Sequence, residues 1–360
     1  MNLSGRVILI FGGLIFAILT TLHSHGQSSL WREMKGTIFV HPIADSTDIH
    51  SSQKILELRG ENSLPLWFSR EIYKDVCLTK ECRMVRLRMY WNGTGDYSGI
   101  EVPENEPLTK TDHSVFNPDD YKKLDSILSD SLSVLKNLKL KDLIIGKVNK
   151  SKEEVDGHTG ATQPSLQEYL VRNAAYTCYT LWHTVYGPTR DEIRLVLEER
   201  ADQNLLRLLL TWKEPHYLIW AIGFIKRHQE YHQNFYSEIM NLIKSEDSNV
   251  SQNALHYFST GRLSSINIQI KLARMIGDVS LENRYEIIRK FSELPQVCND
   301  AILIMLEQFE SQKISASSFS DVGKLIGTEN LKDLLIIEKI TNISKTKNLY
   351  ILKITQKLLQ

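Results

Sequence analysis

One short polar loop holds the residue types that could do chemistry in this chain of 360 residues. It reads Asp156-Gly157-His158-Thr159-Gly160-Ala161-Thr162, and the pattern after it predicts a helix from Ser165 to Tyr186. Glycines let a backbone turn tightly and approach a ligand closely. A helix start presents unpaired amides and a positive dipole end, which favour a phosphate. Such a loop can also simply cap the helix through the hydroxyl of Thr162 or Ser165.

The loop resembles the D-[GA]-x-[ST]-G-A-T flavinylation motif of bacterial FMN-binding domains, the NqrC and RnfG type of ion-pumping redox complexes and other exported flavoproteins. In that family a flavin transferase joins the phosphate of FMN to the last threonine of the motif through a phosphoester. The resemblance therefore implies FMN attached covalently at Thr162. The cofactor-binding set that it implies is Thr162 with Asp156, Gly157, Thr159, Gly160, Ala161 and Ser165.

Two further groups of residues have a functional and a structural interpretation. Asp112 and His113 could form an acid/base couple, but adjacent side chains seldom point at each other and no nucleophile lies beside them. We interpret them as structural, or as the rim of a flavin site. Tyr176, Tyr179 and His183 recur at helical spacing and could face a flavin ring, although such a row is more often core packing. We expect no catalytic residue.

The N-terminal segment predicts export. An uncharged apolar run, Val7–Leu22, follows Arg6 and precedes the small residues Ser24-His25-Gly26. This is the layout of a secretory signal peptide over residues 1–26. The run is short for a membrane-spanning helix, which needs about 20 residues, but a retained anchor is the alternative. We therefore expect a periplasmic protein, or one anchored in the membrane and facing the periplasm.

Export determines how the cysteines are interpreted. Cys77 and Cys82 lie close together, and an oxidising compartment favours a local disulfide between them, with unpaired thiols as the alternative. A metal site would need a second pair or clustered histidines, and none is near. Cys178 and Cys298 fall in helical patterns and are expected to act as small hydrophobic residues.

Two parts of the chain follow different patterns. Residues 27–187 mix strands, turns and helices, and the alternation in Arg83–Tyr90 and Tyr97–Val102 predicts a hairpin. Residues 188–360 contain amphipathic stretches joined by short connections, which predict a solenoid of the HEAT or armadillo kind, or else an irregular helical bundle. The expected fold is an α+β, FMN-binding-like domain (27–187) followed by an all-α, HEAT/armadillo-like domain (188–360).

Composition excludes some classes of function. With 43 Lys+Arg against 43 Asp+Glu, the chain lacks the basic surplus of a nucleic-acid-binding protein. We expect an exported electron carrier or binding protein rather than a turnover enzyme, with a flavin transferase and a redox or envelope protein as partners. The H-x-E-T-P-G segment that many family members use around the flavin ring is absent. The alternative is therefore a cofactor-free cell-envelope interaction protein that binds through its helical solenoid.

Overall fold

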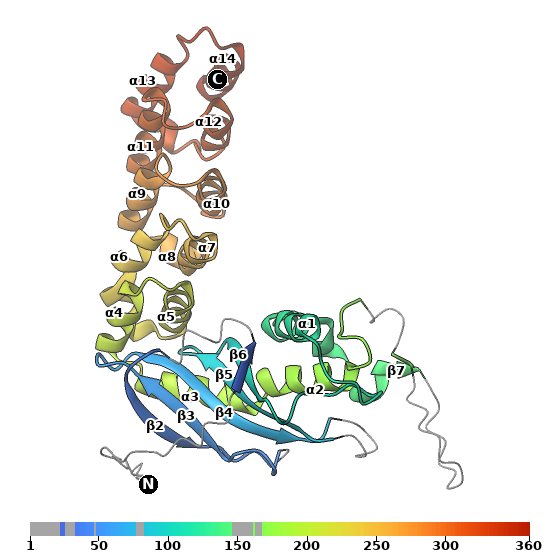
Figure 1. The fold of residues 1–360 in the computed structure, drawn as a ribbon. Helices are drawn as coiled ribbons and strands as arrows, with labels where there is room; N and C mark the ends of the chain where they lie inside the picture. Colours follow the sequence, from blue (N-terminus) through green and yellow to red (C-terminus); the bar gives the residue numbers. More distant parts are fainter. Residues whose placement is uncertain (1–21, 26–32, 47, 77–82, 146–160, 163–167) are drawn as a thin grey trace. The chain divides into compact units, whose positions relative to one another are not determined.

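The computed structural model describes residues 22–25, 33–46, 48–76, 83–145, 161–162 and 168–360. The chain forms two compact units, Met1–Glu199 and Arg200–Gln360. The first contains an antiparallel sheet with helices and the second contains helices alone (Figure 1), which confirms the predicted α+β and all-α layout. Within the described ranges, no helix is both long enough and apolar enough to cross a membrane.

An antiparallel sheet forms the centre of the first unit. Its strands are β1 (Leu22–His25), β2 (Thr37–Pro42), β3 (Lys54–Arg59), β4 (Pro65–Lys74), β5 (Val85–Asn92) and β6 (Tyr97–Pro103). Their order in the sheet is β1-β6-β5-β4-β3-β2. Arg88 lies opposite Glu101 in the β5–β6 pair, so the predicted hairpin is confirmed. The edge strand β1 lies inside the segment predicted as a signal peptide, and cleavage after Gly26 would remove it from β6.

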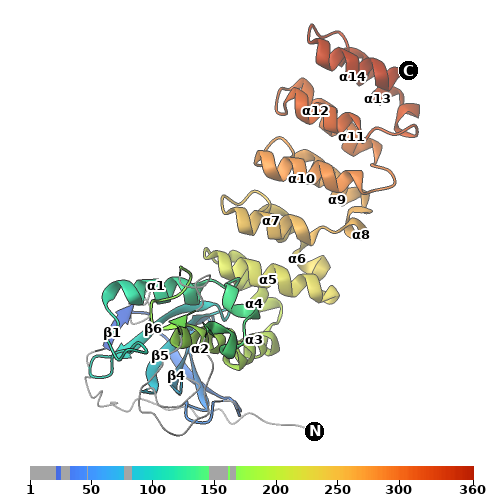
Figure 2. The ribbon, with the colours of Figure 1, turned by 90° about the vertical axis from the view of Figure 1, so that its right-hand side faces the viewer.

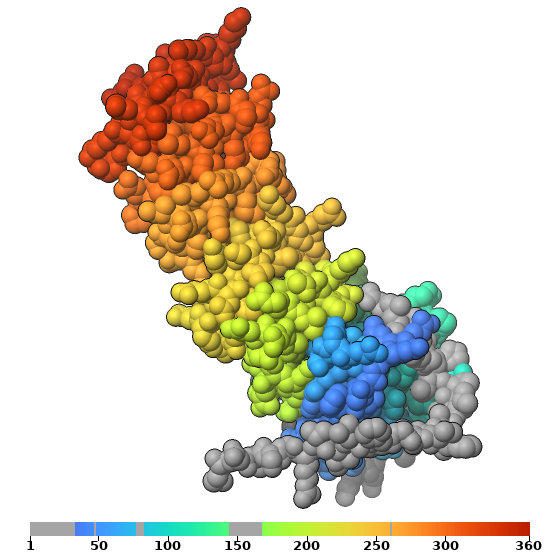
Figure 3. Space-filling model, turned by 90° about the vertical axis from the view of Figure 1, so that its left-hand side faces the viewer, coloured from blue at the N-terminus to red at the C-terminus, as the bar shows by residue number. Residues whose placement is uncertain are grey.

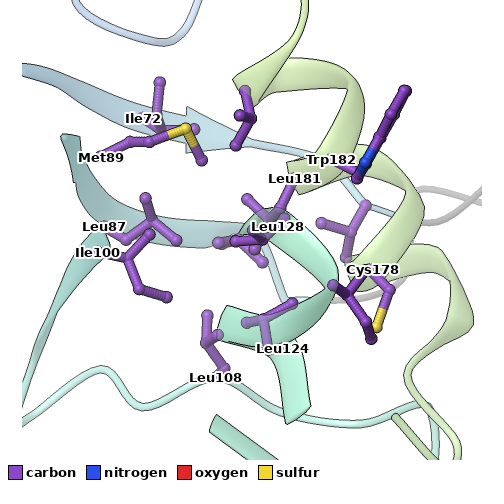
Figure 4. Close-up of a cluster of buried hydrophobic side chains, with 14 of the residues drawn as sticks. Ile72, Leu87, Met89, Ile100, Leu108, Leu124, Leu128, Cys178, Leu181 and Trp182 are labelled. Atoms are coloured by element: carbon purple, nitrogen blue, oxygen red, sulfur yellow. The ribbon is translucent and has the colours of Figure 1, made fainter. Parts of the chain in front are cut away.

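Two helices pack on one face of this sheet because the alternating strands place their apolar side chains there. They are α1 (Pro118–Ser129), which begins with a capping box of Asn117 and Asp120, and α2 (Ala175–Val185). Figure 4 shows their contact with the strands: Leu124 and Leu128 of α1 and Leu181 of α2 meet Ile72, Leu87, Met89 and Ile100 of the sheet. The segment between the helices contains two short helices, η1 (Val134–Asn137) and η2 (Leu140–Leu143), and a strand pair, β7 (Ile144–Ile145) with β8 (Ala161–Thr162).

The third helix, α3 (Pro188–Arg200), belongs to the first unit. Ile193 and Val196 join the same hydrophobic core as the sheet, and Thr189 accepts a hydrogen bond from Arg70 of β4. The boundary between the units therefore lies after Glu199, later than the expected boundary at residue 187.

The helices of the second unit form two rows. Row A comprises α4 (Gln203–Thr211), α6 (His232–Leu242), α9 (Ile266–Met275), α11 (Asn299–Glu310) and α13 (Leu334–Ile343). Row B comprises α5 (Pro215–Arg227), α7 (Ser248–Tyr257), α10 (Leu281–Ser292), α12 (Ala316–Gly323) and α14 (Leu349–Leu359). Neighbours within row B contact one another from α5 to α14. Row B faces the viewer in Figure 2, and Figure 3 shows the side of row A. The short helices η4 (Gln229–Tyr231), α8 (Thr260–Leu263) and η5 (Asn330–Lys332) lie in the connections.

The helices of row B form a structural repeat that the identities of their amino acids do not reveal. The residues before its helices are Glu214, Asp247, Ser280, Ser315 and Asn348, spaced about 33 to 35 residues apart. Seven positions after each of these, the side chain is buried: Ala221, Ala254, Ile287, Val322 and Thr355. Because the same positions face the neighbouring helices in every pair, the pairs are structural repeats.

Candidate functional site

The structure describes only the end of the flavinylation-like loop. Ala161 and Thr162 form β8, where Thr162 pairs with Ile144 and Ala161 with Ile145. The other residues of the predicted site, Asp156, Gly157, Thr159, Gly160 and Ser165, lie outside the described residues, as do Cys77 and Cys82.

The predicted helix start beside this loop is wrong. The helix expected from Ser165 begins at Ala175, because Leu170 and Val171 are buried in the core as part of a turn. Asn173 has a φ of 57°, a left-handed conformation that a right-handed helix cannot pass through. Thr162 therefore lies in a strand and not at the N-terminus of α2, so the argument that a helix dipole holds a phosphate there no longer applies.

The aromatic row of α2 has a structural role. Three of its polar tips bond to main-chain carbonyls of one segment: Tyr186 Oη donates to Leu128 O (2.8 Å), Trp182 Nε1 to Asp130 O (2.9 Å) and Tyr179 Oη to Leu138 O (3.2 Å). His183 Nε2 lies 3.1 Å from Leu135 O. These carbonyls lie at the end of α1 or in the turns and the short helix η1 that follow it, so the α2 side chains bind the main chain of the segment after α1. Burial raises the pKa of Tyr186 to about 12, so its phenol remains a donor over the physiological range. The core interpretation of this row is confirmed.

Asp112 forms the hydrogen bonds of a structural turn residue. Asp112 Oδ1 accepts hydrogen bonds from Ser114 Oγ (2.6 Å) and Ser114 N (3.1 Å), and its Oδ2 accepts one from Asn173 Nδ2 (2.9 Å). His113 is exposed and has a φ of 62°. The Asp112 carboxylate thus connects its own tight turn to the turn before α2, and both of its oxygens accept hydrogen bonds.

The acid dependence of this turn is a testable consequence. Hydrogen bonds from Ser114 and Asn173 lower the pKa of Asp112 from 3.8 to about 2. Because the folded-state pKa is depressed, the stabilising contribution is fully present above pH 3.8 and disappears as the pH falls through about 2. An NMR titration of the Asp112 carboxyl should give a midpoint near 2, and Asp112→Asn should flatten the stability profile between these values. A midpoint at 3.8 would contradict the assignment.

Other buried charges were not predicted from the sequence. Glu57 of β3 is fully buried and binds His41 Nε2 (2.7 Å) and the Arg59 guanidinium (2.6 and 2.7 Å). Arg59 in turn lies 3.8 Å above the ring of Phe39. Glu57 occupies a core position in the strand Lys54–Arg59. An acidic residue among the apolar residues of this strand was the sequence signal from which a buried charge could have been predicted. The cluster neutralises a carboxylate inside the sheet.

A mixed-charge cleft of about 850 Å³ lies over the ends of β4, β5 and β6. Arg88 Nη2 donates to Glu71 Oε1 (2.6 Å), and Arg86 Nη1 lies 3.7 Å from Glu106 Oε1. The charged side chains at this cleft largely pair with one another, so the cleft favours neither an anionic nor a cationic ligand. Across the described part of the chain, no group of three or more His, Cys, Asp or Glu side chains could hold a metal ion.

Comparison with known proteins leaves the site without a precedent: no family model, no curated protein and no solved structure matches the chain.

Proposed function

We propose that this protein is an exported interaction protein that binds another protein through the helical pairs of its second unit, a short-repeat solenoid of the HEAT/armadillo kind. The continuous row B supports this function because stacked helical pairs offer an extended surface rather than an enclosed pocket. Large apolar side chains remain exposed on it: Ile266, Leu281, Tyr285, Leu334, Leu349 and Tyr350. Exposed apolar groups of this kind commonly mark protein-binding surfaces.

Site-specific cross-linking tests this function in the full chain. A photoreactive residue in place of Ser320 in row B, or of Ile337 in row A, should yield a discrete covalent adduct with one partner in the native cell envelope. The purified partner should then bind the unmodified chain in isothermal titration calorimetry. If neither position yields a partner that binds in purified form, the proposed function is wrong.

A second candidate function is that of a covalent flavoprotein, and the D-G-x-T-G-A-T loop ending at Thr162 favours it. In this case FMN is joined to Thr162 by a phosphoester and the protein transfers electrons outside the cytoplasm. The backbone of Thr162 pairs with Ile144 in the short strand β8, and the resemblance assigns the phosphoester to the hydroxyl of this residue.

Intact mass decides between modified and unmodified protein. After co-expression with a flavin transferase, the wild-type chain should gain the mass of one FMN less water. Thr162→Ala should abolish the gain completely, whereas the control Ser165→Ala should retain it, since the resemblance assigns the phosphoester to Thr162 alone. An unchanged wild-type mass, with the transferase active on a known substrate, would eliminate this candidate.

A further inference from the structure

The outer side of row B carries a group of exposed side chains on its last three helices, which we call the terminal patch. The patch consists of Leu281 and Tyr285 of α10, Lys324 at the end of α12, and Leu349, Tyr350, Lys353 and Lys357 of α14. These helices lie next to one another in row B (Figure 2). The patch is therefore a single surface built from segments that are far apart in the sequence.

The apolar members of the terminal patch are unusually exposed. The exposed fractions are 69% for Leu281, 61% for Tyr285, 72% for Leu349 and 51% for Tyr350. Leu281 and Leu349 are the first residues of their helices, directly after Ser280 and Asn348, so they occupy the same repeat position. Exposed leucines at this position of α10 and α14, each with an exposed tyrosine on the same helix, provide apolar anchors for a partner.

Lys324 links the two tyrosines of the patch. Its ammonium donates to Asp321 Oδ1 at 2.7 Å and interacts electrostatically with the phenols of Tyr350 and Tyr285. The hydrogen bond to Asp321 is the main reason that the pKa of Lys324 is raised, and the two phenols contribute in the same direction. Lys324 at the end of α12 therefore lies near side chains of both neighbouring helices of the patch.

The charge at this end of the unit is positive. After Glu338 the chain has Lys339, Lys345, Lys347, Lys353 and Lys357 and no Asp or Glu. Lys339 pairs with Glu310, but Lys353 and Lys357 are exposed and form no ion pair with the described residues. They lie one and two turns after Leu349 on the same face of α14, so two positive charges lie next to the apolar part of the patch.

We propose that the terminal patch binds an acidic peptide segment of a partner protein in which carboxylates alternate with large apolar side chains. This inference rests on the proposed function and adds the location and chemistry of the partner. Carboxylates would meet Lys353 and Lys357, and apolar side chains would pack on Leu349 and the two tyrosines. A short peptide fits better than an anionic membrane, because only two patch lysines form no ion pair with the described residues, whereas binding to an anionic membrane takes a larger basic cluster.

Fluorescence anisotropy with defined probes tests the assignment on the full chain. The probe is a labelled synthetic peptide that alternates Glu with Leu and Phe, and its control carries Lys in place of Glu. The acidic peptide should bind more tightly than the basic one, and its affinity should fall as salt is added. The double variant Lys353→Glu/Lys357→Glu and the single variant Tyr350→Ala should each weaken binding by about tenfold or more.

A charge-matched control separates the patch from net charge. Lys244→Glu/Lys313→Glu makes the same change of charge at exposed residues beside Asp278, outside the patch, and should leave binding nearly unchanged. Equal weakening by both double variants, or equal binding of both peptides, would overturn the assignment. The assignment would also be overturned if the chain bound phosphatidylglycerol vesicles but not the acidic peptide and the patch variants abolished that binding. A membrane would then be the occupant of the patch.

The same measurements distinguish failure here from failure of the proposed function. If a partner cross-links to row A and binds the patch variants as tightly as wild type, the terminal patch is not its binding site. The proposal that the chain is an interaction protein would still stand. Absence of a partner at both rows would overturn the proposed function itself. Circular dichroism melts of the patch variants should match wild type, because every substituted side chain is exposed.

Discussion

Replacing Asp45 by alanine is expected to lower the free energy of unfolding of the first unit by about 3–5 kcal/mol. Asp45 Oδ2 accepts a hydrogen bond from Arg70 Nη1 at 3.0 Å, and the two side chains are only 4% and 0% exposed. Arg70 also donates to Ser52 O and Thr189 Oγ1, both at 2.7 Å, so it is held in place. Without Asp45, the guanidinium charge would stay buried without its carboxylate, and the interior cannot solvate it.

The size of this effect depends on burial, and two further variants test that. Glu71→Ala removes the partner of Arg88 on the same sheet, where the side chains are 64% and 36% exposed, so the loss should be at most about 1 kcal/mol. Asp45→Leu combined with Arg70→Met removes both buried charges and should recover most of the loss. Hydrogen exchange of β4 and β5 in urea measures the first unit specifically. A loss from Asp45→Ala no larger than that from Glu71→Ala would contradict the prediction.

Replacing Phe291 by alanine should destabilise the second unit by about 3–5 kcal/mol. Phe291 is fully buried near the end of α10, at the position that Phe258 occupies one repeat earlier. The substitution leaves a cavity between neighbouring helices that their backbones can fill only partly. Because each pair contacts only its neighbours, protection should fall most around α10 and in the pairs that follow it, and least in α4 and α5.

A surface substitution on the same helix serves as the control. Tyr285→Ala removes an aromatic ring of similar size from α10, but the side chain is 61% exposed, so the change should stay within about 0.5 kcal/mol. Segment-resolved hydrogen exchange by mass spectrometry gives both values in one experiment. Equal loss of protection from the two variants would show that burial does not control stability here.

Local pattern determined much of the first unit and the class of the second. The alternation in β5 and β6 predicted their hairpin because one face of each strand must be apolar. Amphipathic stretches with short connections predicted helices after residue 188 for the same reason, since one face of each helix must be buried. Both patterns depend only on residues that are close together in the chain, so the sequence alone is enough to recognise them.

Tertiary contacts decided the rest. α2 starts at Ala175 because Leu170 and Val171 are buried in the core before it and Asn173, in a left-handed conformation, turns the backbone between Val171 and the helix. α3 joins the first unit because Thr189 binds Arg70, a contact across more than a hundred positions of sequence. No local sequence pattern contains both partners of such a contact.

The sequence by itself determined the two unlike parts of this protein, the one loop that suggests a cofactor, and the neutral charge that argues against nucleic acid. Only the tertiary structure decided the repeat register and the terminal patch. At one repeat position the side chains range from Ala221 to Thr355, so identity conceals the repeat, while burial reveals it. The physical reason is that packing selects for shape and exposure at a position, and several kinds of side chain satisfy the same position equally well.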